Sequence, residues 1–250
     1  MKRRISGFLA LIALILAMAL CFTSCDALLK DILGEELGSL VSSILNGGGD
    51  VNVPSVDLDS IPPFEDSPYV IINDNVPFFE EDEIVTESYE YFSELDALER
   101  CGVTIACIGQ DLMPTEDRES IGSVKPSGWQ SVKYDCVDGK YLYNRCHLIG
   151  FQLTGENANK QNLITGTRYM NVDGMLPFED MVADYVKETG NHVMYRVTPI
   201  FEGDNLVANG VLMEAYSVED NGEGICFCVY VYNNQPGIVI DYSNGDSHEE

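Results

Sequence analysis

The sequence has few positive charges for its length. Of its 250 residues, 14 are Lys or Arg and 41 are Asp or Glu, which gives a formal net charge of −27. A protein that coats nucleic acid in bulk needs a positive surface that attracts phosphates, so this class is excluded. Any chemistry on a phosphate must therefore depend on a local site that works against the field of the whole chain.

Cysteine and histidine are also scarce. Eight cysteines are too few for a disulfide-dense miniprotein, although a few bridges are compatible with an exported chain. Three histidines leave few candidates for a general base near neutral pH. Hydrophobic residues make up 45% of the chain, enough for a real core, and this excludes a wholly disordered protein.

The N-terminus carries an export signal. Lys2, Arg3 and Arg4 precede an almost wholly apolar run of about 17 residues, which is short for a membrane-spanning helix. The run ends at Phe22-Thr23-Ser24-Cys25, which resembles the lipobox of bacterial lipoproteins. We therefore predict a signal peptide over residues 1–24 and lipidation of Cys25. A plain cleaved signal and an uncleaved anchor are the alternatives, and all three readings export the remainder.

Residues 25–67 differ in composition from the rest of the chain. Residues 27–46 carry apolar side chains at helical spacing and end at Gly47-Gly48-Gly49, so they predict an amphipathic helix. That helix either binds a membrane surface or partner, or docks on the domain or another copy. Residues 50–67 are acidic and rich in Ser and Pro, as in a tether. We expect a globular domain over residues 68–250, with a net charge of −22.

The globular part predicts an α+β fold with a central antiparallel sheet and flanking helices. Strand-like segments lie at 69–72, 102–108, 192–201, 206–217 and 224–233. A hairpin is predicted from 129–134 and 141–143, and helices from 91–100, 162–171 and 177–187. The last helix has Pro177 in its first turn and Gly190 just beyond its end.

His147 is the histidine with a setting suited to catalysis. His192 and His248 lie in polar surroundings, whereas His147 lies near Arg145 and is followed by a loop rich in side-chain amides. Hydrolysis of a phosphodiester needs a base for water, a cation at the phosphate oxygens and stabilisation of the leaving oxygen. A neutral histidine, an asparagine carbonyl that holds Mg²⁺ and an arginine can meet these needs.

The segment Tyr143-Asn144-Arg145-Cys146-His147-Leu148-Ile149-Gly150 resembles the Asp-Arg-Gly-His signature of the DNA/RNA non-specific endonucleases. Further likeness comes from segments 125–129, 159–171 and 195–199, and it covers roughly residues 68–246. These segments resemble most the secreted and DNA-entry-type nucleases of Gram-positive bacteria. The resemblance implies a ββα-metal (His-Me) finger and hydrolysis of DNA, and of RNA, with little base preference.

The resemblance also implies roles for particular residues. His147 matches the general base and Asn171 the protein ligand of Mg²⁺, or of Mn²⁺ in its place. Asn162 matches an asparagine that supports the site, and Glu179 an acid near the metal that acts through a metal-bound water. Arg145 matches the signature arginine, which either faces phosphate or braces the finger.

Two residues depart from the signature. Asn144 stands where the family has Asp, and Cys146 stands where it has Gly. We expect activity to survive, because the signature Asp is less direct than the histidine. The Cys146 side chain needs space or a partner, and Cys101 is our first choice for a disulfide, with Cys136 as the second.

Basic residues that could meet the substrate are few: Arg118, Lys125, Lys133, Arg168 and Arg196. We rank Lys125 and Arg168 first, because they lie in segments next to the signature or next to Asn171. Binding by a domain of this charge should be weak and strongly salt-dependent.

The main alternative is a non-catalytic surface module that retains the nuclease fold for binding. The Asn144 and Cys146 departures and the negative charge favour it. A Cys-His peptidase built on Cys146 or Cys136 is disfavoured, because neighbouring side chains such as Cys146 and His147 diverge. The oligomeric state is not indicated by the sequence.

Overall fold

The computed structural model describes residues 58–250. The predicted signal peptide, Cys25, the predicted helix over 27–46 and residues 50–57 of the tether lie outside the described residues. Among the described residues, no helix has the length and apolar character needed to cross a membrane.

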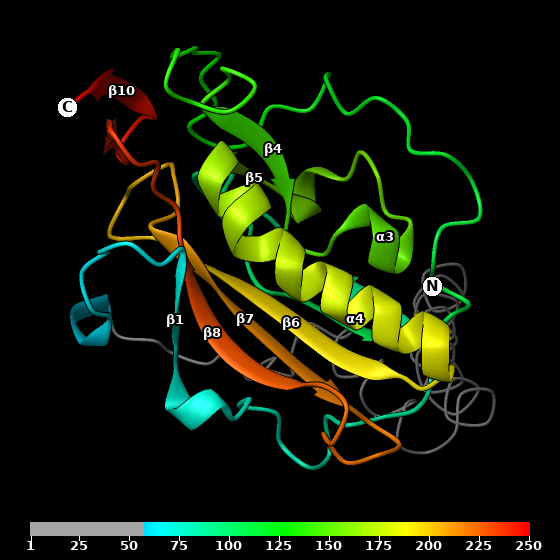
Figure 1. The fold of residues 1–250 in the computed structure, drawn as a ribbon. Helices are drawn as coiled ribbons and strands as arrows, with labels where there is room; N and C mark the ends of the chain where they lie inside the picture. Colours follow the sequence, from blue (N-terminus) through cyan, green and yellow to red (C-terminus); the bar gives the residue numbers. More distant parts are fainter. Residues whose placement is uncertain (1–57) are drawn as a thin grey trace, which may run out of the picture. The chain divides into compact units, whose positions relative to one another are not determined.

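A six-stranded antiparallel sheet is the centre of the described part, with the strand order β1-β8-β7-β6-β3-β2 (Figure 1). Its strands are β1 (Tyr69–Ile71), β2 (Tyr89–Phe92), β3 (Thr104–Ile108), β6 (Val193–Ile200), β7 (Gly210–Ser217) and β8 (Cys226–Tyr232). The predicted α+β class with a central antiparallel sheet is confirmed. Strands β6, β7 and β8 were all predicted, as the strand-like segments 192–201, 206–217 and 224–233.

Strand β6 shows how the sheet separates two cores. Successive side chains of a strand point to opposite faces. Tyr195 and Val197 join the large core cluster under helix α4 (Leu176–Thr189), while Met194 packs in a smaller cluster on the other face. Arg196 lies between Tyr195 and Val197 in sequence, so it points to the same face as Met194, and it is fully buried.

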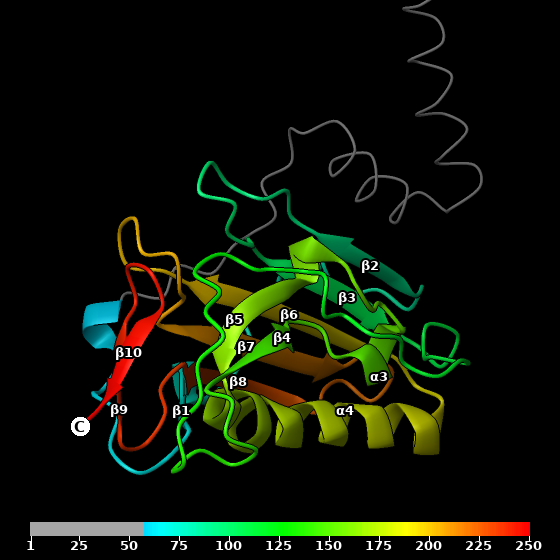
Figure 2. The ribbon, with the colours of Figure 1, turned by 90° about the horizontal axis from the view of Figure 1, so that it is seen from above.

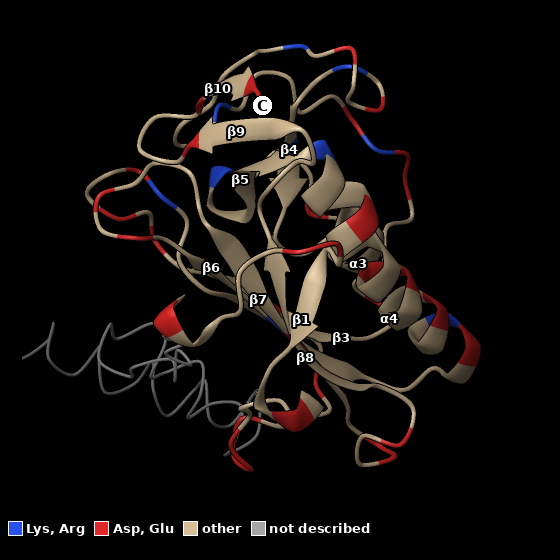
Figure 3. Ribbon diagram, turned by 60° about the vertical axis from the view of Figure 1, so that its left-hand side comes forward, with Lys and Arg blue, Asp and Glu red and all other residues tan. Residues whose placement is uncertain are grey.

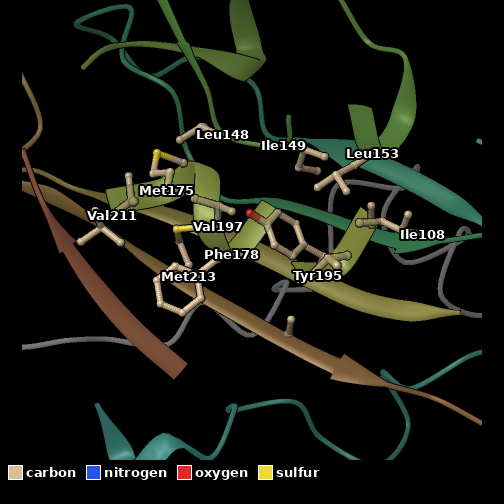
Figure 4. Close-up of a cluster of buried hydrophobic side chains, with 14 of the residues drawn as sticks. Ile108, Leu148, Ile149, Leu153, Met175, Phe178, Tyr195, Val197, Val211 and Met213 are labelled. Carbon is tan, nitrogen blue, oxygen red and sulfur yellow. The ribbon is translucent and has the colours of Figure 1, made fainter. Parts of the chain in front are cut away.

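Helix α4 covers one face of the sheet. Its buried residues Phe178, Val182 and Val186 pack on the sheet, and Figure 4 shows Phe178 near Tyr195, Val197 and Met213. Pro177 lies in its first turn, and Gly190 ends the helix at φ 75°, a left-handed conformation that glycine adopts without strain. The helix predicted over 177–187 is therefore confirmed.

A second sheet forms the finger. Strands β4 (Tyr143–His147) and β5 (Leu163–Thr167) pair in antiparallel fashion and lie beside the start of α4 (Figures 1 and 2). Between them lie the short helices α3 (Phe151–Thr154) and η3 (Lys160–Asn162). After β5 the chain enters a π-helical turn, η4 (Met170–Met175), which continues directly into α4. Two strands followed by a helix give the expected ββα arrangement.

The remaining elements lie at the margins of the domain. A C-terminal hairpin consists of β9 (Ile238–Asp241) and β10 (Asp246–Glu249). Two single 3-10 turns, η1 (Leu58–Ser60) and η2 (Asn73–Asn75), flank β1.

Two predicted helices are wrong. Residues 162–171 contain strand β5, because Ile164, Thr165 and Thr167 are β-branched and pair with β4. Residues 91–100 contain the end of β2 and a turn, in which the Asp96 carboxylate accepts hydrogen bonds from the backbone N–H groups of Leu98 and Arg100. Such local hydrogen bonds compete with a helix.

The predicted hairpin over 129–134 and 141–143 is reduced to a single bridge between Lys133 and Tyr141. The predicted disulfide of Cys146 with Cys101 or Cys136 is also wrong, because the six cysteines in the described part of the chain are free. Cys146 instead fills a space over Gly166 of β5. A Cβ atom built on Gly166 would lie 2.7 Å from the Cβ of Cys146.

Candidate active site

His147 is the last residue of β4 and is buried, with 6% of its surface exposed. Its Nε2 atom lies 2.7 Å from the backbone oxygen of Asn157. A carbonyl oxygen only accepts hydrogen bonds, so Nε2 carries the proton and Nδ1 has a free lone pair in the neutral ring. A guanidinium nitrogen of Arg118 lies 3.3 Å from Nδ1 and donates to it.

The surroundings keep the His147 ring neutral. Burial lowers its pKa to about 4, the hydrogen bond to Asn157 opposes this shift, and the nearby Arg118 charge adds to it. At pH 7 the imidazole is therefore unprotonated at Nδ1. This is the protonation state that a general base requires.

Asn162 fixes the backbone that follows His147. Its side-chain oxygen accepts from the backbone N–H of Ile149 at 2.8 Å, and its Nδ2 donates to the oxygen of Ile149 at 2.9 Å. The backbone oxygen of Asn162 accepts from Leu148 at 2.9 Å. The side chain is fully buried. It therefore holds the geometry of the segment after His147 and has no path to a substrate.

Asn171 lies within the π-helical turn η4. Single π-turns inside helices occur frequently at functional sites. Its Nδ2 donates to Oδ1 of Asn144 at 3.3 Å, and its Oδ1 accepts from the thiol of Cys146 at 2.9 Å. Asn171 is thereby tied to strand β4, which carries His147.

Glu179 comes from the first turn of α4 and packs against the backbone of Gly150. A Cβ atom on Gly150 would lie 2.7 Å from a carboxylate oxygen of Glu179, so this close approach requires glycine. Burial raises the pKa of Glu179 to about 8, the neighbouring Asp180 adds to the shift, and Arg118 opposes it. Without a bound metal ion, the carboxyl is therefore largely protonated at neutral pH.

These side chains line one pocket of about 610 Å³. His147, Asn144, Asn171 and Glu179 reach it from the finger and from α4, and Arg118, Arg145 and Arg168 also line it. The predicted base, the predicted metal ligand, the predicted acid and three of the candidate arginines thus meet in one place.

Arg145 braces the loop beside the pocket. Its side chain donates to the backbone oxygens of Val124 and, at 2.8 Å, Gly122, and its guanidinium lies 4.1 Å from the centre of the Trp129 ring. Of the two roles left open by the sequence, these contacts support bracing. The guanidinium also lines the pocket, so a phosphate there could still meet it.

Arg168 lines the pocket and forms an exposed ion pair with Asp138 at 2.9 Å. Lys125, which we ranked with it, is exposed and is not part of the pocket lining. Arg196 is wrong as a candidate for substrate binding, because it is fully buried and paired with Glu214 on the other face of the sheet.

Positive charge is concentrated around the finger. Residues 118–168 contain seven basic and four acidic residues, although the domain as a whole is strongly acidic. Figure 3 shows acidic residues along α4 and in the loops at the end of the domain opposite the β9–β10 hairpin. The pocket therefore draws its three arginines from a segment that holds more basic than acidic residues, within an acidic protein.

Two other chemistries find no support in this geometry. The Cys146 thiol contacts Asn171 and the sulfur of Met175, and burial raises its pKa well above the usual value, so it forms no thiolate–imidazole pair with His147. In the described part of the chain, no three His, Cys, Asp or Glu side chains are close enough to hold a metal ion. A cation here would depend on the Asn171 carboxamide and on water.

A model of the DNA/RNA non-specific endonuclease family matches residues 81–219, which is more than half of the chain. The chain belongs to this family. No protein of curated function matches it.

The fold agrees with solved nuclease structures. NucA from Streptococcus agalactiae, solved without metal and with a magnesium ion, has a TM-score of 0.65 and 23% identity, over 75% of this chain and 90% of NucA. The Sda1 nuclease, solved with a bound zinc ion, has a TM-score of 0.64 and 26% identity, over 74% of this chain and 97% of that one.

Some features of this endonuclease site escaped the sequence analysis. Arg118 was named as a basic candidate but was ranked below Lys125 and Arg168. Nothing in the sequence of its loop indicates that it contacts His147. Asn157 enters through a backbone oxygen, which no side-chain pattern reveals. A signal that could have singled out Gly150 is its position three residues after His147, where a glycine opens space for Glu179.

Proposed function

We propose that this protein is a metal-dependent non-specific endonuclease that hydrolyses phosphodiester bonds of DNA and RNA outside the cytoplasm. His147 is the general base and Asn171 is the protein ligand of Mg²⁺, or of Mn²⁺ in its place. The observation that carries this proposal is the neutral His147 ring, with an unprotonated Nδ1 in a pocket that Asn171 and Glu179 also line.

The base acts through Nδ1. The Asn157 carbonyl holds the proton on Nε2 and fixes the orientation of the ring, so Nδ1 is the atom that takes a proton from water. Arg118 now donates to Nδ1 at 3.3 Å. A phosphate in the pocket attracts this guanidinium, and its movement makes room for the water at Nδ1. Arg118 thus joins Arg145 and Arg168 as a group that meets the phosphate.

The donors in the pocket fit a hard divalent cation. Carboxamide and carboxylate oxygens suit Mg²⁺, which keeps several water molecules and needs few protein ligands. Asn171 would hold the ion directly and Glu179 would face its water shell, where the ion's charge favours the ionised carboxylate. When bound, Mg²⁺ polarises the phosphate and neutralises charge that develops on the leaving oxygen. NucA has been solved with magnesium, which is consistent with this choice.

The N-terminal region supports export and surface attachment. We propose a signal peptide over residues 1–24, lipidation at Cys25, an amphipathic helix and an acidic tether over residues 25–67, and the endonuclease domain over residues 68–250. The basic start, the apolar run and the Thr-Ser-Cys ending support this organisation. The protein would then be a cell-surface lipoprotein or, if Cys25 is not lipidated, a secreted enzyme.

The direct test uses the purified domain and supercoiled plasmid. We expect nicking and degradation with Mg²⁺, and no degradation with EDTA. His147→Ala and Asn171→Ala should each lose activity, while His248→Ala, a matched change of an exposed histidine in the C-terminal hairpin, should keep it. Full activity of His147→Ala would refute the assignment of the base.

The binding-module alternative is favoured by Asn144 and Cys146, which replace two signature residues. It predicts that wild-type protein retains DNA without cleaving it at any Mg²⁺ or Mn²⁺ concentration. The plasmid assay and a gel-shift assay on the same samples separate the two functions.

A further inference from the structure

Two residues that depart from the family signature contact the same side chain. Asn144 and Cys146 are two positions apart on β4, and residues at this spacing share one face of a strand. On that face, Asn144 Oδ1 accepts from Nδ2 of Asn171 at 3.3 Å, and the Cys146 thiol donates to Oδ1 of Asn171 at 2.9 Å. Both departures therefore bear on one carboxamide.

These two contacts distinguish the two ends of the amide. A rotation of the Asn171 amide by 180° would place its NH₂ group against the thiol and its oxygen against the oxygen of Asn144. The hydrogen bond from the thiol would be lost, and two oxygens would face each other unless the Asn144 amide turned as well. An amide oxygen has two lone pairs, so Asn171 Oδ1 can accept from the thiol and still bind a cation.

The Cys146 sulfur has little freedom to move. The side chain is fully buried, and its Sγ lies 3.4 Å from the sulfur of Met175. Across the finger, Gly166 leaves the space that Cys146 occupies, since a Cβ atom there would lie 3.2 Å from Sγ. The thiol has one proton, and Asn171 Oδ1, at 2.9 Å, is a nearer acceptor than the sulfur of Met175, at 3.4 Å, or the backbone oxygen of His147, at 3.8 Å.

We propose that Cys146, together with Asn144, is a positioning residue that orients the Asn171 carboxamide so that its oxygen faces the divalent cation. This inference rests on the proposed function of Asn171 as metal ligand. Cys146 supplies a donor that the signature Gly lacks, and Asn144 keeps an acceptor for Nδ2 of Asn171, as the signature Asp also would.

The test measures cation binding apart from catalysis. Mn²⁺ affinity is determined from the electron paramagnetic resonance signal of free Mn²⁺ for wild type, Cys146→Ala, Cys146→Ser and Asn144→Ala. We expect Cys146→Ala to weaken Mn²⁺ binding about 3- to 10-fold, the value of one neutral hydrogen bond. Cys146→Ser keeps a donor and should stay within about twofold of wild type. Asn144→Ala, which opens no core cavity, should weaken binding in the same direction.

Activity provides a second readout. The Mg²⁺ concentration for half-maximal plasmid cleavage should rise in Cys146→Ala by the same factor, while kcat at saturating Mg²⁺ stays near wild type. The matched control is Cys107→Ala, which truncates a buried cysteine on β3 that contacts the backbone of Val85 and not the finger. Its Mn²⁺ affinity should be unchanged.

The outcomes separate the two proposals. If wild type and Asn171→Ala bind Mn²⁺ equally well, or if neither binds it, the metal-ligand role of Asn171 fails. If wild type binds Mn²⁺ through Asn171 but Cys146→Ala and Asn144→Ala bind it equally well, the positioning role fails alone. Equal weakening in Cys146→Ser and Cys146→Ala would also overturn it, because a lost donor would then not be the cause.

Discussion

Two clusters of buried titratable side chains lie on opposite faces of the central sheet, one around Arg196 and the other around His147 and Glu179. They differ in how completely their charged forms are paired. Arg196 of β6 donates to Glu214 at 2.8 Å and 3.1 Å and to Glu83 at 3.0 Å, and its guanidinium lies 4.5 Å from the centre of the Phe79 ring. In the candidate active site, burial raises the pKa of Glu179 and lowers that of His147, so both groups favour their neutral forms.

The difference shows which of the two is structural. The Arg196 network keeps its charges because each is met by an opposite charge, and the register that places Arg196 opposite Glu214 was set by strand pairing. The charges on Glu179 and His147 are not compensated by the protein alone. Perturbed pKa values in a pocket are typical of a site that becomes complete only with a cation and a substrate.

The largest expected effect is on catalysis. His147→Ala should lower kcat/KM by about 10²- to 10⁴-fold, the usual contribution of a general base. The free energy of unfolding should change little by comparison. Steady-state kinetics and urea denaturation on the same samples measure the loss of activity and the change in stability. If His147→Ala were unfolded, the catalytic role of this face could not be separated from a structural one.

The Arg196 network should show the reverse behaviour. Arg196→Met leaves Glu214 buried without its partner and should lower the free energy of unfolding by about 3–5 kcal/mol. Cleavage by the fraction that remains folded should be unaffected at low temperature. A loss of kcat that exceeds the loss of folded protein would mean that this face also contributes to the active site.

The pH dependence of stability sharpens the comparison. The folded-state pKa of Glu179 is about 8, above that of a free carboxyl, so its contribution to stability is complete at low pH and is lost as the pH rises through 8. In EDTA, Glu179→Gln should therefore become more stable than wild type as the pH rises from 5 to 8, by on the order of 2 kcal/mol, because Gln carries no charge that burial would disfavour. His147 is present in both proteins, so its opposite effect cancels. Urea denaturation at several pH values tests this, and parallel curves would contradict it.

The smallest expected effects concern surface charge. Arg168 lines the pocket and Lys125 does not, so Arg168→Ala should weaken DNA binding about 3- to 10-fold and Lys125→Ala by less than about twofold. Fluorescence anisotropy with EDTA and a labelled duplex, measured over a range of salt concentrations, gives both affinities. The ranking fails if the two variants weaken binding equally.

The C-terminal strands and helix α4 were predictable because their signals are local. The runs of apolar and aromatic residues predicted β6, β7 and β8, and Pro177 and Gly190 marked helix α4. Strand β5 was not predictable in this way, because its Asn162 and polar neighbours also suit the start of a helix. Pairing with β4, a contact between distant segments, decided its structure.

The site divides in the same way. The sequence by itself determined the residue types for the chemistry, since His147, Asn171, Glu179 and Arg145 stand in a recognisable order along the chain. Only the tertiary structure decided that Arg118 contacts His147, that the Asn157 carbonyl selects its tautomer and that Cys146 contacts Asn171. The physical reason is that burial, hydrogen-bond direction and pKa depend on groups that are far apart in sequence and meet only when the finger packs against α4.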